Sequence, residues 1–181
     1  MSCIIAFSGL PQTGKTTLAR LLARELQCKF VSFGDFVRQE ALNRGILNAT
    51  RQDLQNLGQS LVTENVRDFC RNVLGTVKFS AGEQIVLDGV RHTEVLEIIS
   101  EISEGQPIKL VLLTASEKTR GNRSLQDINS IDSHRVESEV KVQFPAIADI
   151  VINTENDEAE ALRTLEDWIR KDPDCKTNNS V

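Results

Sequence analysis

Short apolar runs alternate along this chain with longer segments of helical periodicity. The runs have the profile of strands buried on both faces, and they cover residues 2–8, 29–33, 84–88, 108–113 and 150–152. Between them, apolar residues recur at spacings of three and four, which predicts helices over residues 15–27, 35–43, 51–74, 94–102 and 155–170. Strands that alternate with helices predict an α/β fold, with a parallel sheet covered by helices on both faces.

The length of 181 residues fits one domain with a full-sized core. We expect that domain to span residues 1–171 and to be followed by a flexible tail, residues 172–181, which contains Pro, Asn and Ser. No apolar run approaches the roughly 18 residues that cross a bilayer, and no basic segment precedes the first one. These features predict a cytoplasmic protein without a membrane partner; they leave open whether it is a monomer or a homodimer.

Charge, cysteine and histidine content argue against several classes of partner and site. The net charge of −5 makes nucleic acid an unlikely partner for the surface as a whole. The four cysteines are far apart and form no Cys-x-x-Cys pair, so we expect reduced, packed thiols in place of disulfides or a zinc site. The two histidines, His92 and His134, have no cysteine or second histidine beside them, so a metal site there is not expected.

Residues 9–16 read Gly-Leu-Pro-Gln-Thr-Gly-Lys-Thr and match the phosphate-loop pattern G-x4-G-K-[S/T] between a predicted strand and a predicted helix. The glycines let backbone N–H groups turn inward as an anion nest at a helix N-terminus. Lys15 would reach the β- and γ-phosphates of ATP, and the Thr16 hydroxyl would ligate Mg²⁺. The predicted ATP contacts from this segment are Gly9, Pro11, Gln12, Thr13, Gly14, Lys15, Thr16 and Thr17.

Four charged side chains follow other predicted strands. Asp88 ends an apolar strand, where a carboxylate can hold a water on Mg²⁺, although an Asp-Gly turn is the simpler alternative. The ends of parallel strands converge, so Asp35, Arg38 and Arg91 should face the same crevice. The two arginines would neutralise an acceptor phosphate, and Asp35 would orient the attacking oxygen or merely cap a helix.

Two of these segments carry a resemblance. Residues 87–91 (Leu-Asp-Gly-Val-Arg) and 34–38 (Gly-Asp-Phe-Val-Arg) resemble motifs of the nucleoside monophosphate kinase superfamily, most closely the branch of dephospho-CoA kinase-like proteins and deoxynucleoside monophosphate kinases. Residues 50–59 are similar to the acceptor-side helix of that branch, and residues 148–153 to its final strand. The resemblance implies a three-layer P-loop NTPase sandwich with a five-stranded parallel sheet in the order 2-3-1-4-5. It also implies acceptor-binding helices at about residues 35–74 and a short lid at about 115–135.

The same resemblance implies roles for individual residues. Arg38 and Arg91 would bind the acceptor phosphate, with Arg135 entering from the far side of the lid. Arg120 and Arg123, at the start of the lid, would stabilise the transferring phosphoryl group. Arg120 and Asn153 would also contact ATP, and Asp35 would be a base or an orienting group. In adenylate kinases a glutamine that contacts the acceptor base usually follows the segment that matches residues 88–91. Here His92-Thr93-Glu94-Val95 follow Arg91, which argues against AMP as the acceptor.

Together these observations predict a kinase that transfers the γ-phosphoryl group of Mg·ATP to a nucleotide or a nucleotide-like acceptor such as dephospho-CoA. The alternative is a regulatory or assembly ATPase in which nucleotide binding switches a partner interaction. Phosphorylation of a nucleic-acid end is a third reading, disfavoured by the net charge.

Overall fold

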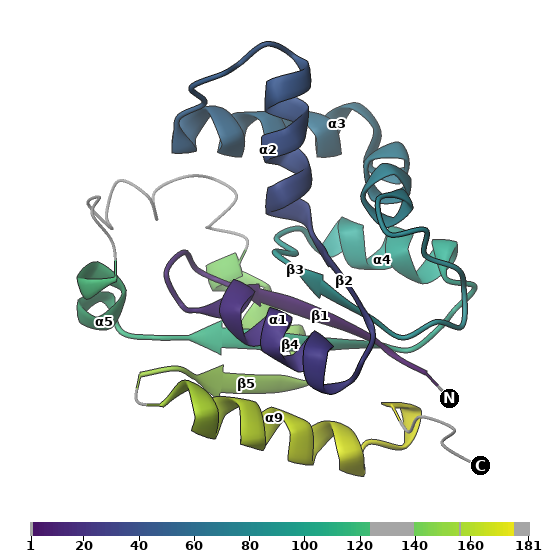
Figure 1. Ribbon diagram of the computed structural model, residues 1–181, viewed down its shortest axis with the longest axis vertical. Helices are drawn as coiled ribbons and strands as arrows, with labels where there is room; N and C mark the ends of the chain where they lie inside the picture. The colour runs from purple at the N-terminus through teal and green to yellow at the C-terminus, as the bar shows by residue number, and fades with distance from the viewer. Residues whose placement is uncertain (1, 124–139, 156, 176–181) are drawn as a thin grey trace.

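The computed structural model describes residues 2–123, 140–155 and 157–175. They form a five-stranded parallel sheet in the order β2-β3-β1-β4-β5 (Figure 1). The strands are β1 (Ile4–Gly9), β2 (Lys29–Ser32), β3 (Ile85–Asp88), β4 (Ile108–Thr114) and β5 (Ile150–Asn153). The α/β class and the strand order expected from the sequence are therefore confirmed.

Helices cover both faces of the sheet and make a three-layer sandwich. One face packs against α1 (Lys15–Glu25) and α9 (Glu158–Lys171). The other packs against α2 (Phe33–Asn43), α3 (Arg51–Gly75), α4 (Thr93–Ile102) and α8 (Phe144–Ile147). The short helices α5 (Glu117–Asn122) and η1 (Pro173–Cys175) complete the described chain, in which no helix is long and apolar enough to cross a membrane.

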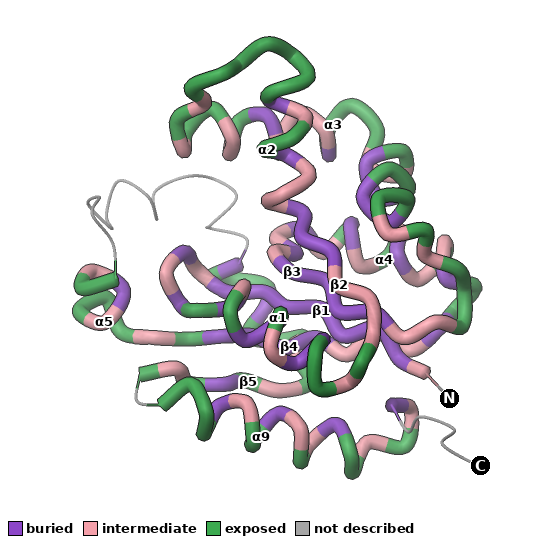
Figure 2. Tube along the Cα trace, in the orientation of Figure 1, coloured by how far each residue is buried: buried purple, intermediate pink, exposed green. Residues whose placement is uncertain are grey.

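The central strand β1 supplies both layers of the core. Ile4 and Ala6 pack with the helices of one face, whereas Ile5 and Phe7 pack with α1 and α9 on the other. All six residues of β1 are buried, as the tube of Figure 2 shows. A strand with two buried faces gives the continuous apolar run seen in the sequence.

Helix α3 consists of two segments that meet at Asn65, whose φ of −163° and ψ of 90° are not helical. The first segment begins with a complete capping box between Thr50 and Asp53. The second is capped by Asn65 itself, whose Oδ1 accepts a hydrogen bond from the backbone N–H of Asp68 at 3.0 Å. The sequence predicted one continuous helix here, and the side-chain cap at Asn65 explains the break.

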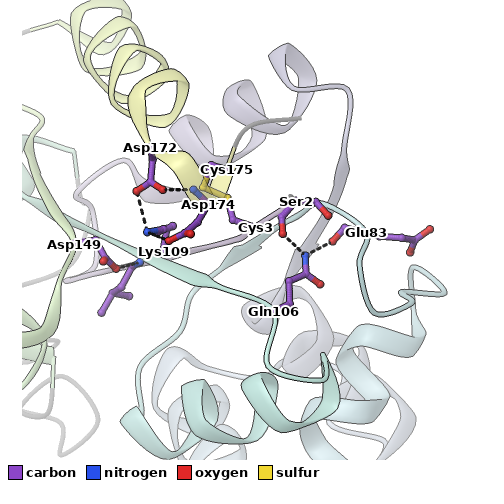
Figure 3. The surroundings of a disulfide bond; sticks show 10 residues. Ser2, Cys3, Glu83, Gln106, Lys109, Asp149, Asp172, Asp174 and Cys175 are labelled. Carbon is purple, nitrogen blue, oxygen red and sulfur yellow. Dashed lines mark hydrogen bonds and ion pairs between the residues drawn. A yellow bond between two sulfur atoms is a disulfide. The ribbon is translucent and has the colours of Figure 1, made fainter. Parts of the chain in front are cut away.

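The cysteine expectation was wrong for one pair, because Cys3 and Cys175 form a disulfide across a sequence separation of 172 residues (Figure 3). It joins the start of β1 to η1. The segment is also held by Lys109, whose Nζ lies 2.9 Å from Asp172 and 2.8 Å from Asp174. Residues 172–175, expected to belong to a flexible tail, are thus fixed to the sheet.

The two remaining cysteines are thiols. Burial raises the pKa of Cys28 to about 11 and that of Cys70 to about 12, so both stay protonated at neutral pH. They behave as small packed apolar residues, as expected.

Removing the disulfide should lower stability without changing the fold. The entropy of closing so long a loop predicts that Cys175→Ala loses about 2–5 kcal/mol of unfolding free energy. Urea denaturation of the oxidised protein measures this loss. A reductant should destabilise the wild type and leave Cys175→Ala unchanged; equal stability of the two oxidised proteins would contradict the prediction.

Gly9 has a close backbone neighbour that excludes a side chain. A Cβ at this position would lie 2.5 Å from the carbonyl oxygen of Leu113, and the φ of +144° disfavours other residues. We expect Gly9→Ala to lower the unfolding free energy by about 2–4 kcal/mol. Gly82→Ala is the control, because Gly82 has a positive φ but open space around it; it should cost about 1 kcal/mol. Equal losses in urea denaturation would refute the steric explanation.

Candidate functional site

The loop between β1 and α1 has the backbone of an anion nest. Gly9, Gln12 and Gly14 all have positive φ, at 144°, 64° and 84°. Helix α1 begins directly after Gly14, a residue that has no side chain to cap it, so the N-terminus of the helix adjoins the loop. Such a loop at a helix N-terminus favours a phosphate through both hydrogen bonds and the helix dipole.

Three side chains form hydrogen bonds to backbone carbonyl groups of this loop. The Thr13 hydroxyl donates to the carbonyl of Leu10 at 2.8 Å, and Lys15 Nζ reaches the same carbonyl at 3.3 Å. Thr154, just after β5, donates to the Thr13 carbonyl at 2.7 Å. Lys15 is buried, whereas Thr17 is exposed on the first turn of α1. Thr154 carried no signal in the sequence, because its role depends on the pairing of β5 with β4.

Asp88 lies at the end of β3 where strand register brings the neighbouring elements together. Its Oδ2 accepts hydrogen bonds from Thr16 Oγ1 at 2.8 Å and from Ser32 Oγ at 3.1 Å. Asp88 is 2% exposed, and its buried Oδ1 has no hydrogen-bond partner among the described residues. Ser32 was not predicted as a site residue; it pairs with Asp88 because β2 and β3 are in register there.

This arrangement fits Mg²⁺. A threonine hydroxyl beside a carboxylate with a spare buried oxygen offers hard oxygen ligands for the ion or its waters. Within the described part of the chain, no group of three His, Cys, Asp or Glu side chains could hold a metal by itself. The ion would therefore arrive with nucleotide phosphates as its other ligands.

Two arginines of the predicted lid lie against the phosphate loop. Arg120, on α5, is 2% exposed and its Nη1 lies 3.4 Å from the Pro11 carbonyl oxygen. Arg123 donates to the carbonyls of Gln12 at 3.4 Å and of Thr154 at 2.7 Å. Arg135 lies outside the described residues. Asn153 ends β5, and its Oδ1 accepts a hydrogen bond from the N–H of Glu155 at 2.9 Å.

The carboxylate of Asp35 is shared between two guanidinium groups. Arg20 of α1 donates to its Oδ2 at 3.0 Å, and Arg38 forms an ion pair with its Oδ1. The cap of α2 is Ser32, whose Oγ accepts from the Asp35 N–H at 3.3 Å. Arg20 was not predicted, because its contact depends on how α1 and α2 pack.

A cavity of about 310 Å³ opens between the phosphate loop, α2, the first segment of α3 and the chain after β3. The predicted site residues that line it are Pro11, Gln12, Lys15, Thr16, Arg38, Asp88 and Arg91. Asp35 is not among the lining residues. Polar lining residues that the sequence analysis did not assign are Ser32, Arg51, Gln55, Gln59 and His92. The apolar wall consists of Phe33, Val37, Leu54, Val62, Phe69, Val90 and Val95.

Known proteins with similar sequences include a UPF0200 protein of Aeropyrum pernix, 31% identical over 68% of this chain and 64% of that relative, so the match spans just under two thirds of the relative's length. A UPF0200 protein of Methanosarcina acetivorans is 29% identical over 99% of this chain and 96% of its own. An adenylate kinase of Thermococcus onnurineus is 26% identical over 79% of this chain and 74% of its own length.

Proteins with solved structures share this fold. Shikimate kinase from Aquifex aeolicus is 14% identical, with a TM-score of 0.58 over 92% of this chain and 96% of that one. At this identity the likeness concerns the fold alone, which is that of P-loop kinases. A family model described as an AAA domain, AAA_18, matches residues 5–163, a range that includes the phosphate loop, Asp88, Arg120 and Arg123. The chain therefore belongs to the AAA_18 family of P-loop proteins.

Proposed function

We propose that this protein is an ATP-dependent kinase that transfers the γ-phosphoryl group to a phosphate oxygen of a small acceptor, such as a nucleoside monophosphate. The observation that carries the proposal is the cavity beside the phosphate loop, which joins Lys15 and Thr16 to Arg38 and Arg91 in one chamber. Adenylate kinase relatives and the shared kinase fold support the same reaction class.

On the donor side, the loop amides and Lys15 would bind the β- and γ-phosphates of ATP. Bound Mg²⁺ would neutralise charge on these phosphates, held by Thr16 and, through water, by Asp88. Arg120 and Arg123 already lie against the loop, where their charge would stabilise the transferring phosphoryl group. Thr17, Asn153 and Arg135 remain proposed contacts.

The lining of the cavity favours a phosphate oxygen over a hydroxyl as the group that attacks the γ-phosphorus of ATP. Asp88 is the only carboxylate among the described lining residues, and it is engaged by Thr16 and Ser32. An alcohol would need a base to remove its proton, a task for which His92 would be the remaining candidate. An ionised phosphate needs none: its oxygen forms a bond to the γ-phosphorus, the bond to the β-phosphate oxygen breaks, and ADP leaves.

Asp35 enters this proposal as a positioning residue. Its carboxylate contacts Arg38 and Arg20 and does not line the cavity. It would hold the Arg38 guanidinium beside the acceptor phosphate, an indirect role in place of proton removal. The apolar wall would enclose the rest of the acceptor and exclude water from the transfer.

An acceptor screen tests the function. Purified protein with Mg·ATP should release ADP slowly alone and much faster with one or more ribo- or deoxynucleoside monophosphates, as followed by a coupled ADP assay. Dephospho-CoA and shikimate serve as alcohol acceptors. Rapid ADP release that no acceptor changes would favour a regulatory ATPase and contradict the proposal.

Lys15→Ala should abolish phosphoryl transfer while leaving the fold intact, because the lysine would contact charge that develops on the transferring group. We expect kcat/KM to fall by about 100-fold or more. Circular dichroism and urea denaturation check the fold, and steady-state kinetics check the loss. Wild-type turnover in this variant would remove Lys15 from the site.

Arg38→Ala should raise the KM for the acceptor by roughly 10–100-fold and change the KM for ATP less than about threefold. The reason is that Arg38 lies on the acceptor side of the cavity, on α2. Arg44→Ala, near the end of the same helix and paired with Glu40, is the matched control and should alter neither constant. Equal effects of Arg38→Ala on both constants would contradict an acceptor clamp.

A further inference from the structure

We propose that Gln59 reads the base of the acceptor, and that this base presents an N–H donor to it. The inference rests on the proposed function, since it specifies the acceptor that the same cavity takes. Gln59 lies on the first segment of α3, which lines the cavity with Leu54, Gln55, Gly58 and Val62. These positions recur at helical spacing, so one face of the segment forms the wall.

Only one end of the Gln59 amide has a hydrogen-bond partner among the described residues. Its Nε2 donates to the Thr63 hydroxyl, one turn along the helix, at 3.3 Å. Its Oε1 is buried, and no described group donates to it. Buried carbonyl oxygens nearly always have a donor, so an unmatched one on a cavity wall is a position for a ligand N–H.

The apolar residues that line the cavity together with Gln59 suit a flat aromatic ring. Val37, Val62 and Phe69 are apolar, and Gly58 has no side chain. A Cβ at Gly58 would be in van der Waals contact with Val37 Cγ2, at 3.7 Å, so the two helices come close at this point of the apolar wall. A polyhydroxylated acceptor would lose hydrogen bonds to water against such a wall, whereas a base places its faces on apolar groups and its edge on one polar atom.

The two ends of the cavity belong to different elements. Lys15 and Arg91 come from the edge of the sheet, and Gln59 comes from α3, which projects from that edge with α2 (Figure 1). An acceptor phosphate at the sheet edge therefore leaves the base facing α3. The donors that fit Oε1 are an exocyclic amine or a ring imide N–H.

The experiment compares the preferred nucleoside monophosphate with an analogue that lacks the base N–H. The analogue is purine riboside 5′-monophosphate for a purine, or 2-pyrimidinone riboside 5′-monophosphate for a pyrimidine. Wild-type protein should prefer the natural base by about 10–100-fold in kcat/KM and in Kd from calorimetry. Gln59→Leu should lose this preference, with the KM for ATP changed less than about twofold. Gln52→Leu, an exposed change on the same helix, should retain it.

Each outcome decides between the two proposals. If Gln59→Leu discriminates like the wild type, or loses equally on both acceptors, the base-reading role is overturned while the kinase function stands. If no acceptor is phosphorylated but a monophosphate binds with the Gln59-dependent preference, the kinase function fails and the recognition remains. If calorimetry detects no nucleoside monophosphate binding, the inference is overturned.

Discussion

The site depends on one buried carboxylate, Asp88 of β3, whose hydrogen bonds come from two other elements. Thr16 of α1 and Ser32 at the end of β2 both donate to its Oδ2, and burial makes those hydrogen bonds necessary. Ser32 also accepts the Asp35 N–H and so fixes the start of α2. The Asp35 carboxylate in turn holds Arg38. A contiguous chain of hydrogen bonds therefore connects the proposed metal-binding oxygens to the proposed acceptor clamp.

Strand register sets up this chain of hydrogen bonds, because it brings Ser32 beside Asp88. The strand order was implied by the resemblance to nucleoside monophosphate kinases. From the apolar runs and the loop pattern, the parallel sheet, the phosphate loop and the position of Asp88 could all be predicted. Features that depend on a side chain meeting a distant partner could not. The Arg20–Asp35 pair and the Cys3–Cys175 bond have no periodic signal, and they form only when the elements that carry them have packed. The Asn65 cap is local, but the apolar repeat of residues 51–74 does not mark it.

Asp35 illustrates the limit of motif reasoning within the site. Its position after β2 allowed a base, an orienting group or a helix cap, since all three use a carboxylate at a helix start. In the structure the cap is Ser32, and two guanidinium groups occupy Asp35. Both carboxylate oxygens of Asp35 contact guanidinium groups, and Asp35 does not line the cavity in which an acceptor would lie. The geometry thus favours positioning over proton transfer.

The cavity also bears on the choice between a kinase and a nucleotide-dependent switch. A switch needs the phosphate loop and a surface that responds to nucleotide, but it does not need a chamber beside the loop. Here Arg38, Arg51 and Arg91 share such a chamber with an apolar wall and the buried Gln59 carbonyl oxygen. A buried carbonyl oxygen without a donor, next to apolar groups, destabilises a protein unless a ligand compensates it. A phosphate joined to a flat base would place its charge beside these guanidinium groups and its edge beside that oxygen, which favours the kinase.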